Sequence, residues 1–236
     1  MKRTAFGLSA MLVSFLLGTV IALGSLVAMG GKLDSAALTA FSVPTLLVAC
    51  LVACLDPLAI LLEIVAIVLI AVDSRQVGGL HRRLAWAAAI LFVIWAVANV
   101  AGFVPLSFVG MRRGALALVK AGQLVKAGAA LLQYSVPFLM IFGLTCKWPR
   151  VLLWLALVMT AIGNFGVVVL PISGMQLAPI ELPGQTMYAP RFAVDYGAGV
   201  YPFLLGMGYI GGALYLVVYA FLTWRTWRSV STGEGP

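Results

Sequence analysis

Residues 36–72 read AALTAFSVPTLLVACLVACLDPLAILLEIVAIVLIAV, a run of 37 residues whose only charged side chains are Asp56 and Glu63. As one α-helix at about 1.5 Å per residue the run would be roughly 55 Å long, against about 30 Å for the hydrocarbon core of a bilayer. This length and composition indicate a membrane-spanning helix. Inserting an acid at the centre of such a helix costs on the order of 2.5 to 3.5 kcal/mol, so each carboxylate needs a partner or a function.

The composition of the whole chain agrees with a lipid environment. Hydrophobic residues make up 63% of the 236 residues, charged residues make up 9%, and the mean hydropathy is +1.11, whereas soluble domains carry about 25% charged residues. The net charge of +8 comes from Lys and Arg residues scattered between apolar segments, without the contiguous basic face of a nucleic-acid-binding protein. We therefore expect the lipid bilayer, and no nucleic acid, as a partner.

Six apolar segments of about 20 residues or more are bounded by charged or turn-forming residues. They predict an all-α, polytopic transmembrane helix bundle that forms a single domain over residues 1–236. The N-terminal segment is too long for the apolar region of a signal peptide, so we interpret it as the first retained span. The predicted spans are residues 6–29, 46–72, 84–104, 124–146, 151–172 and 201–222.

An even number of spans puts both termini on one side, and the basic residues favour the cytoplasm for that side. Nine Lys and Arg residues then lie inside and six outside, whereas a seven-span alternative that turns at Asp56 and Pro57 gives seven inside and eight outside. Five of the six tryptophans lie near ends assigned to the cytoplasm, as expected for an interfacial aromatic belt. We expect a multi-pass protein of the cell membrane, in a prokaryotic inner membrane.

Two segments outside the spans need a separate interpretation. Residues 173–200 contain three prolines and have a period of neither 2 nor 3.6, so we expect an ordered external loop or cap there. Residues 112–126 place Lys120, Gln123 and Lys126 opposite an apolar arc on a helical wheel. That pattern is compatible with a helix lying flat on the membrane surface, and equally with an ordinary basic loop.

The polar residues within the spans form a candidate column. Asp56 and Glu63 are seven residues apart, so on a continuous helix they would share a face within about 20°. Counting inward from the ends of the other spans adds three amides at similar depths: Asn99, Gln133 and Asn164. The column would carry protons or cations, or bind a polar ligand, with Glu63 as the titrating group. Alternatively, a protonated Glu63 would hold helices together by hydrogen bonds.

The sequence predicts no catalytic residue, no metal site and no cofactor. His81, the only histidine, follows Gly78 and Gly79 and precedes two arginines, so we expect a solvated residue in a cytoplasmic loop. One histidine cannot complete a zinc or bis-histidine haem site, and we interpret Cys50 and Cys54 as small packing residues. No phosphate-binding loop or nucleophile motif is present. We therefore expect that the protein is not an enzyme.

The segment Phe138 to Leu170 consists of an apolar span, the link Lys147-Trp148-Pro149-Arg150 and a second apolar span that contains Gly163 and Gly166. It resembles the helix-link-helix unit of uncharacterised six-span bacterial integral membrane protein families. The resemblance implies the six-span bundle and carries no activity with it.

These features lead to two expectations about function. The first is a non-catalytic subunit or accessory component of a membrane protein complex, which packs against other membrane subunits. Gly208 and Gly212 form a small-xxx-small pattern in the last span, and this pattern predicts close helix packing. The alternative is a small proton-coupled carrier or permease that uses Glu63. A membrane-embedded enzyme acting on lipids or quinones would need a nucleophile, base or metal cluster that we do not find.

Overall fold

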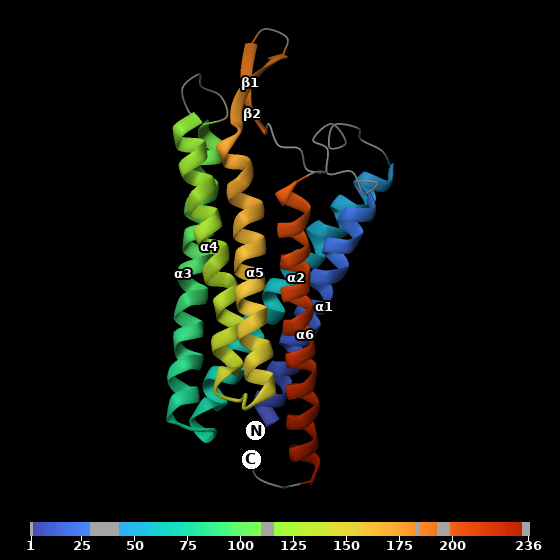
Figure 1. The fold of residues 1–236 in the computed structure, drawn as a ribbon, viewed down its shortest axis with the longest axis vertical. Helices are drawn as coiled ribbons and strands as arrows, with labels where there is room; N and C mark the ends of the chain where they lie inside the picture. Colours follow the sequence, from blue (N-terminus) through green and yellow to red (C-terminus); the bar gives the residue numbers. More distant parts are fainter. Residues whose placement is uncertain (1, 29–42, 110–115, 183–184, 193–198, 233–236) are drawn as a thin grey trace. The chain divides into compact units, whose positions relative to one another are not determined.

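The computed structural model describes residues 2–28, 43–109, 116–182, 185–192 and 199–232. All six of its long helices are apolar enough to cross a membrane, so the predicted six-span membrane protein is confirmed. The elements follow the chain in this order (Figure 1): α1 (Lys2–Ala28), α2 (Val43–Asp73), the 3-10 helix η1 (Ser74–Gln76), α3 (Gly79–Val109), α4 (Leu116–Phe142), α5 (Trp148–Ser173), β1 (Met175–Leu182), β2 (Gln185–Phe192) and α6 (Val200–Thr232).

Helix α2 runs through the position at which a seven-span chain would turn. It is continuous from Val43 to Asp73, with Pro57 inside it. A proline removes one helical hydrogen bond, but a turn in the hydrocarbon core would leave several backbone groups without a partner. The continuous helix is therefore the better solution, and the pair Asp56 and Pro57 lies within a span.

Several helices extend beyond the predicted spans. α6 has 33 residues and is about 50 Å long, so its ends reach past a hydrocarbon core of about 30 Å. α4 begins at Leu116 and ends at Phe142, earlier at both ends than the predicted fourth span. Residues 116–126 are thus the first turns of α4. Arg112 and Arg113 of the predicted surface segment lie outside the described residues.

A β-hairpin lies between α5 and α6, where we expected an ordered external loop or cap. β1 and β2 pair antiparallel, from Met175 opposite Phe192 to Leu182 opposite Gln185. Prolines within both strands obscure the alternation by which a strand is usually recognised. The signal was the turn-favouring pair Pro183-Gly184 between two segments of eight residues. The predicted all-α transmembrane bundle is confirmed, and the hairpin is an addition between its last two helices.

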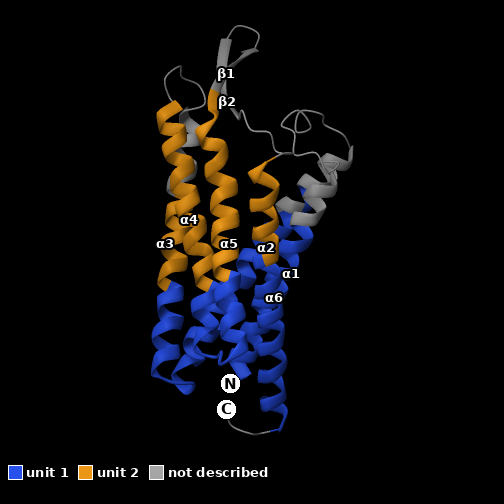
Figure 2. Ribbon diagram, viewed as in Figure 1, with its two compact units in different colours: residues 1–89, 137–156, 211–236 blue, residues 90–136, 157–210 orange. Residues whose placement is uncertain are grey.

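The structure consists of two compact units (Figure 2). Unit 1 holds residues 1–89, 137–156 and 211–236, and unit 2 holds residues 90–136 and 157–210. Helices α1 and α2 belong entirely to unit 1, whereas each of helices α3 to α6 contributes one part to each unit.

In unit 1, α1 packs antiparallel to α2. Gly7 allows the close approach, because a Cβ there would lie 2.8 Å from Ile70 Cγ1 and 3.1 Å from the carbonyl oxygen of Ala66. Farther along α1, the hydroxyl group of Ser14 donates a hydrogen bond of 3.0 Å to the carbonyl oxygen of Ala59. Large, fully buried side chains form the core of unit 1: Leu8, Met11, Ile70, Met140, Ile141, Leu153, Tyr215, Val218 and Tyr219.

In unit 2, α5 and α6 approach each other at glycine residues. A Cβ on Gly163 would overlap the backbone nitrogen of Gly208 and would lie 2.6 Å from the carbonyl oxygen of Leu204. One turn farther, a Cβ on Gly166 would lie 2.7 Å from the side chain of Leu204. Gly212 differs, since a Cβ there would meet no atom of the described chain within 4 Å. Of the two glycines in the small-xxx-small pattern, Gly208 is the one in close contact.

Candidate functional site

Glu63 is an acid buried within unit 1, near the middle of α2. Its side chain is 8% exposed, whereas Asp56, two turns earlier on the same helix, is exposed. Within the part of the chain that the structure describes, no side chain is hydrogen-bonded to the Glu63 carboxyl group. A buried acid without such a bond is costly if it is ionised, so Glu63 is the stronger functional candidate of the two.

The surroundings of Glu63 in unit 1 come from α1 and α6. Ser14 of α1 is bonded to the carbonyl of Ala59, one turn before Glu63 on α2. Tyr219 of α6 is fully buried and lies close enough to Glu63 for an electrostatic interaction. The ring of Phe15 lies 5.3 Å from that of Tyr219, centroid to centroid, in an edge-to-face arrangement. Of these groups, the fully buried Tyr219 is the one with a direct electrostatic relation to Glu63.

The hydroxyl group of Tyr219 has a fixed direction. It donates a hydrogen bond of 2.9 Å to the carbonyl oxygen of Pro137 on α4. Because its single proton is used there, its oxygen retains only acceptor capacity. The proton of this hydroxyl is therefore not available to Glu63.

The other three members of the predicted polar column belong to unit 2. Asn99 on α3 is exposed and Gln133 on α4 is half-buried. Asn164 on α5 donates a hydrogen bond of 3.0 Å to the carbonyl oxygen of Thr160 in its own helix, and its side chain lies beside Gly208. Since the five residues are divided between the two units, the column stays a prediction.

A polar contact that the sequence did not reveal joins α1 to the end of α2. The carboxylate of Asp73 accepts one hydrogen bond from the Thr4 backbone nitrogen, at 3.0 Å, and another from the Thr4 hydroxyl, at 2.6 Å. Both residues are buried in unit 1. Asp73 directly follows the long apolar run in the sequence. Nothing in the sequence pairs it with Thr4, 69 residues away.

The prediction that His81 is a solvated loop residue is wrong. His81 lies in the first turn of α3 and is 2% exposed, and neither of its ring nitrogens has a hydrogen-bond partner among the described residues. The absence of a side chain at Gly143 leaves room for His81, because a Cβ at Gly143 would lie 2.8 Å from the Cβ of His81. The missed signal was helical spacing: His81, Ala85 and Ala88 share one face, and all three are buried.

In the described part of the chain, no group of three or more His, Cys, Asp or Glu side chains could hold a metal ion. The cysteines are exposed, so our interpretation of Cys50 and Cys54 as interior packing residues is wrong. Comparisons of the chain with protein-family models, with curated proteins and with solved structures find no match.

Proposed function

We propose that this protein is a non-catalytic subunit of a membrane protein complex, with other membrane subunits as its partners. The hairpin of β1 and β2 supports this more than any other feature. It follows directly on α5, a helix of 26 residues, which is about 39 Å long and so exceeds a hydrocarbon core of about 30 Å. The hairpin therefore lies outside that core. With both termini in the cytoplasm, as the basic residues favour, it faces the extracytoplasmic side of the inner membrane.

The hairpin has edges that another chain can extend. The described sheet has two strands, so each strand has one edge that no described strand covers. Open edges of this kind pair with extended segments of other chains, and a two-stranded hairpin alone is only marginally stable in water. We infer that a partner subunit contributes a strand or a loop there and orders the hairpin.

Affinity purification of the tagged full chain in a mild detergent tests this proposal. Co-purified proteins would be quantified against a variant in which residues 175–192 are replaced by a Gly/Ser linker of equal length. The variant should lose the partner subunit and still insert into the membrane, because the close packing of α5 and α6 at Gly163 and Gly208 is retained. A similar replacement of residues 110–115 is the control. Equal recovery of all proteins with both variants would contradict the role of the hairpin.

The alternative function, a small proton-coupled carrier, is favoured by one observation. Glu63 is a buried acid within a membrane-spanning helix, and intramembrane acids of this kind are typical of proton and ion pathways. Asp56 on the same helix is exposed and lacks this environment.

Reconstituted vesicles distinguish this alternative. A potassium diffusion potential would drive protons into vesicles that contain a trapped pH-sensitive dye. Glu63→Gln should abolish the proton flux, and Asp56→Asn should leave it unchanged. Flux that survives in Glu63→Gln, or that is lost equally in both variants, would count against a carrier that uses Glu63.

A further inference from the structure

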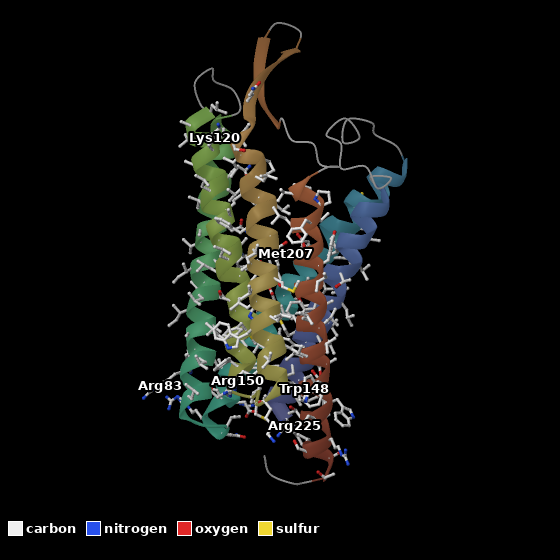
Figure 3. All side chains as sticks on the ribbon, viewed as in Figure 1. Arg83, Lys120, Trp148, Arg150, Met207 and Arg225 are labelled. Carbon is white, nitrogen blue, oxygen red and sulfur yellow. The ribbon has the colours of Figure 1, made fainter. Side chains whose placement is uncertain are left out.

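One end of unit 1 carries a dense basic surface, which we name the headgroup surface. The residues come from the start of α1, from η1, from the start of α3, from the link before α5 and its first turn, and from the last turns of α6. Every one of these side chains is exposed; Figure 3 labels Arg83, Arg150 and Arg225 among them. The full set is Lys2, Arg3, Arg75, Arg82, Arg83, Lys147, Arg150, Arg225 and Arg228.

Contacts within unit 1 show that these segments share one end. Thr4 of α1 is bonded to Asp73 of α2, and Phe6 lies 5.1 Å from the Trp227 ring of α6, centroid to centroid. Gly143, just after α4, contacts His81 of α3. The basic residues therefore form one surface and are not scattered over the unit.

No exposed acid among the described residues balances this surface. Asp73 is the one acid described at this end, and its carboxylate is buried and bonded to Thr4. Asp56 and Glu63 lie 17 and 10 residues earlier on α2, away from its end. Nine exposed basic side chains therefore lie at this end with no exposed acid described among them, and their positive potential attracts anions.

Aromatic side chains lie beside the basic ones: Trp148 and Trp224 are exposed, and Phe221 between them is half-buried. Trp148 at the start of α5 lies 5.0 Å from Phe221 of α6, and Phe221 lies 6.3 Å from Trp224, centroid to centroid. The guanidinium of Arg228 lies over the Trp224 ring at 5.7 Å. Tryptophan is typical of the boundary between headgroups and acyl chains, so these aromatic contacts are consistent with a position of this surface at that boundary.

Exposed apolar side chains adjoin the same surface. Phe6 is 56% exposed, Leu80 is 62% exposed and Val151 is 65% exposed. Each lies within a few residues of a basic member in the sequence. An anion that fits must therefore be joined to an apolar group, and a soluble acidic protein or a nucleic acid would leave these side chains in water.

We propose that the headgroup surface binds anionic phospholipids, with the phosphates on the arginines and the acyl chains along the neighbouring apolar side chains. Basic clusters at the ends of membrane helices attract acidic lipids, and arginine pairs with phosphate in a bidentate geometry. This binding is independent of the proposed subunit role. It selects the lipids that surround the protein and fixes this end at the membrane surface.

Quenching of tryptophan fluorescence by brominated lipids tests this proposal. Five of the six tryptophans belong to unit 1, and all five are exposed: Trp86, Trp148, Trp154, Trp224 and Trp227. The full chain would be placed in phosphatidylcholine nanodiscs that contain an equal fraction of either brominated phosphatidylglycerol or brominated phosphatidylcholine. The anionic lipid should quench more strongly, and the difference should shrink between about 0.1 M and 1 M salt, where the screening length falls from about 10 Å to about 3 Å.

Two arginines of α6 provide the variants. Arg225→Gln/Arg228→Gln should weaken the relative affinity for the anionic lipid about fivefold or more, while Arg225→Lys/Arg228→Lys should retain most of it. Lys120→Gln, in unit 2, should change nothing. Unaltered quenching by brominated phosphatidylcholine would show that a variant is folded. Equal quenching of the wild-type chain by the two lipids, or full selectivity in the Gln variant, would overturn the proposal.

Discussion

The carboxylate of Asp73, the last residue of α2, accepts hydrogen bonds from both the backbone nitrogen and the hydroxyl group of Thr4, in the first turn of α1. The first N–H groups of a helix have no partner within it, and an anion there is favoured by the helix dipole. Asp73 thus caps a helix to which it does not belong. The contact fixes the start of the first span to the end of the second, and both residues are buried.

Removing this cap should destabilise unit 1. Asp73→Ala leaves two buried donors of Thr4 without their acceptor, so we expect the free energy of unfolding to fall by about 2 kcal/mol. Asp73→Asn retains an acceptor oxygen and should cost less. Unfolding in mixed micelles of increasing dodecyl sulfate content, followed by circular dichroism, measures both. Asp56→Ala, an exposed acid on the same helix, is the control and should be neutral; an equal loss there would assign the effect to charge alone.

Substitutions at His81 and at Gly143 should change the free energy of unfolding in opposite directions. His81→Leu replaces a buried ring with two unpartnered nitrogens by an apolar side chain, so the free energy of unfolding should rise by about 1 kcal/mol. Gly143→Ala inserts a methyl group 2.9 Å from the Cα of His81, where the backbone cannot easily move, and should cost about 1 to 3 kcal/mol. The same denaturation measures both. If His81→Leu instead lowered the free energy of unfolding by about 1 kcal/mol, the His81 ring would have a hydrogen-bond partner, and the unpartnered ring nitrogens would be contradicted.

The sequence correctly predicted the features that depend on hydrophobicity and segment length. The run around Glu63 predicted one long helix, and α2 continues through Pro57 because the core of a bilayer offers no water to an interrupted backbone. His81 was misplaced because Gly78 and Gly79 indicate a loop, whereas the helix begins at Gly79. The contact of Thr4 with Asp73 could not be predicted, because it depends on how two helices pack.

The glycines at the contact of α5 with α6 should respond differently from Gly212. Gly163→Ala would force its methyl group into the backbone of α6, so we expect a loss of about 2 kcal/mol or more, since overpacking against backbone is costly. Gly212→Ala meets open space and should be neutral, or stabilising by up to about 1 kcal/mol, because alanine favours a helix over glycine. Equal effects at the two positions would contradict the close approach at Gly163.

The hydroxyl group of Tyr219 should contribute a measurable hydrogen bond. Tyr219→Phe removes the donor to the Pro137 carbonyl oxygen without changing the ring that contacts Phe15. We expect a loss of about 1 kcal/mol in the free energy of unfolding. Tyr209→Phe, at an exposed position on the same helix, is the matched control. A neutral Tyr219→Phe would mean that the bond contributes nothing to stability, and the fixed direction of the hydroxyl toward α4 would then be in doubt.

Glu63 is buried, as its place in the apolar run suggested, and the polar column stays a prediction. Asp56 and Glu63 share a helix face by their spacing, yet one is exposed and the other buried, because burial depends on which neighbours cover each turn. Asn164 also shows that depth along a span does not predict the partner of a polar side chain. Its amide is bonded within its own helix, an option that every amide in a membrane helix has and that depth counting does not detect.

Native mass spectrometry of the full chain, extracted from its own membrane in a mild detergent, tests the central claim most directly. A single spectrum reports partner proteins, stoichiometry and retained lipids. The subunit role predicts that the chain of 24.9 kDa appears in an assembly with at least one other membrane protein at a fixed ratio. A chain that appears only as a monomer, under conditions in which known complexes of the same membrane stay intact, would contradict that role.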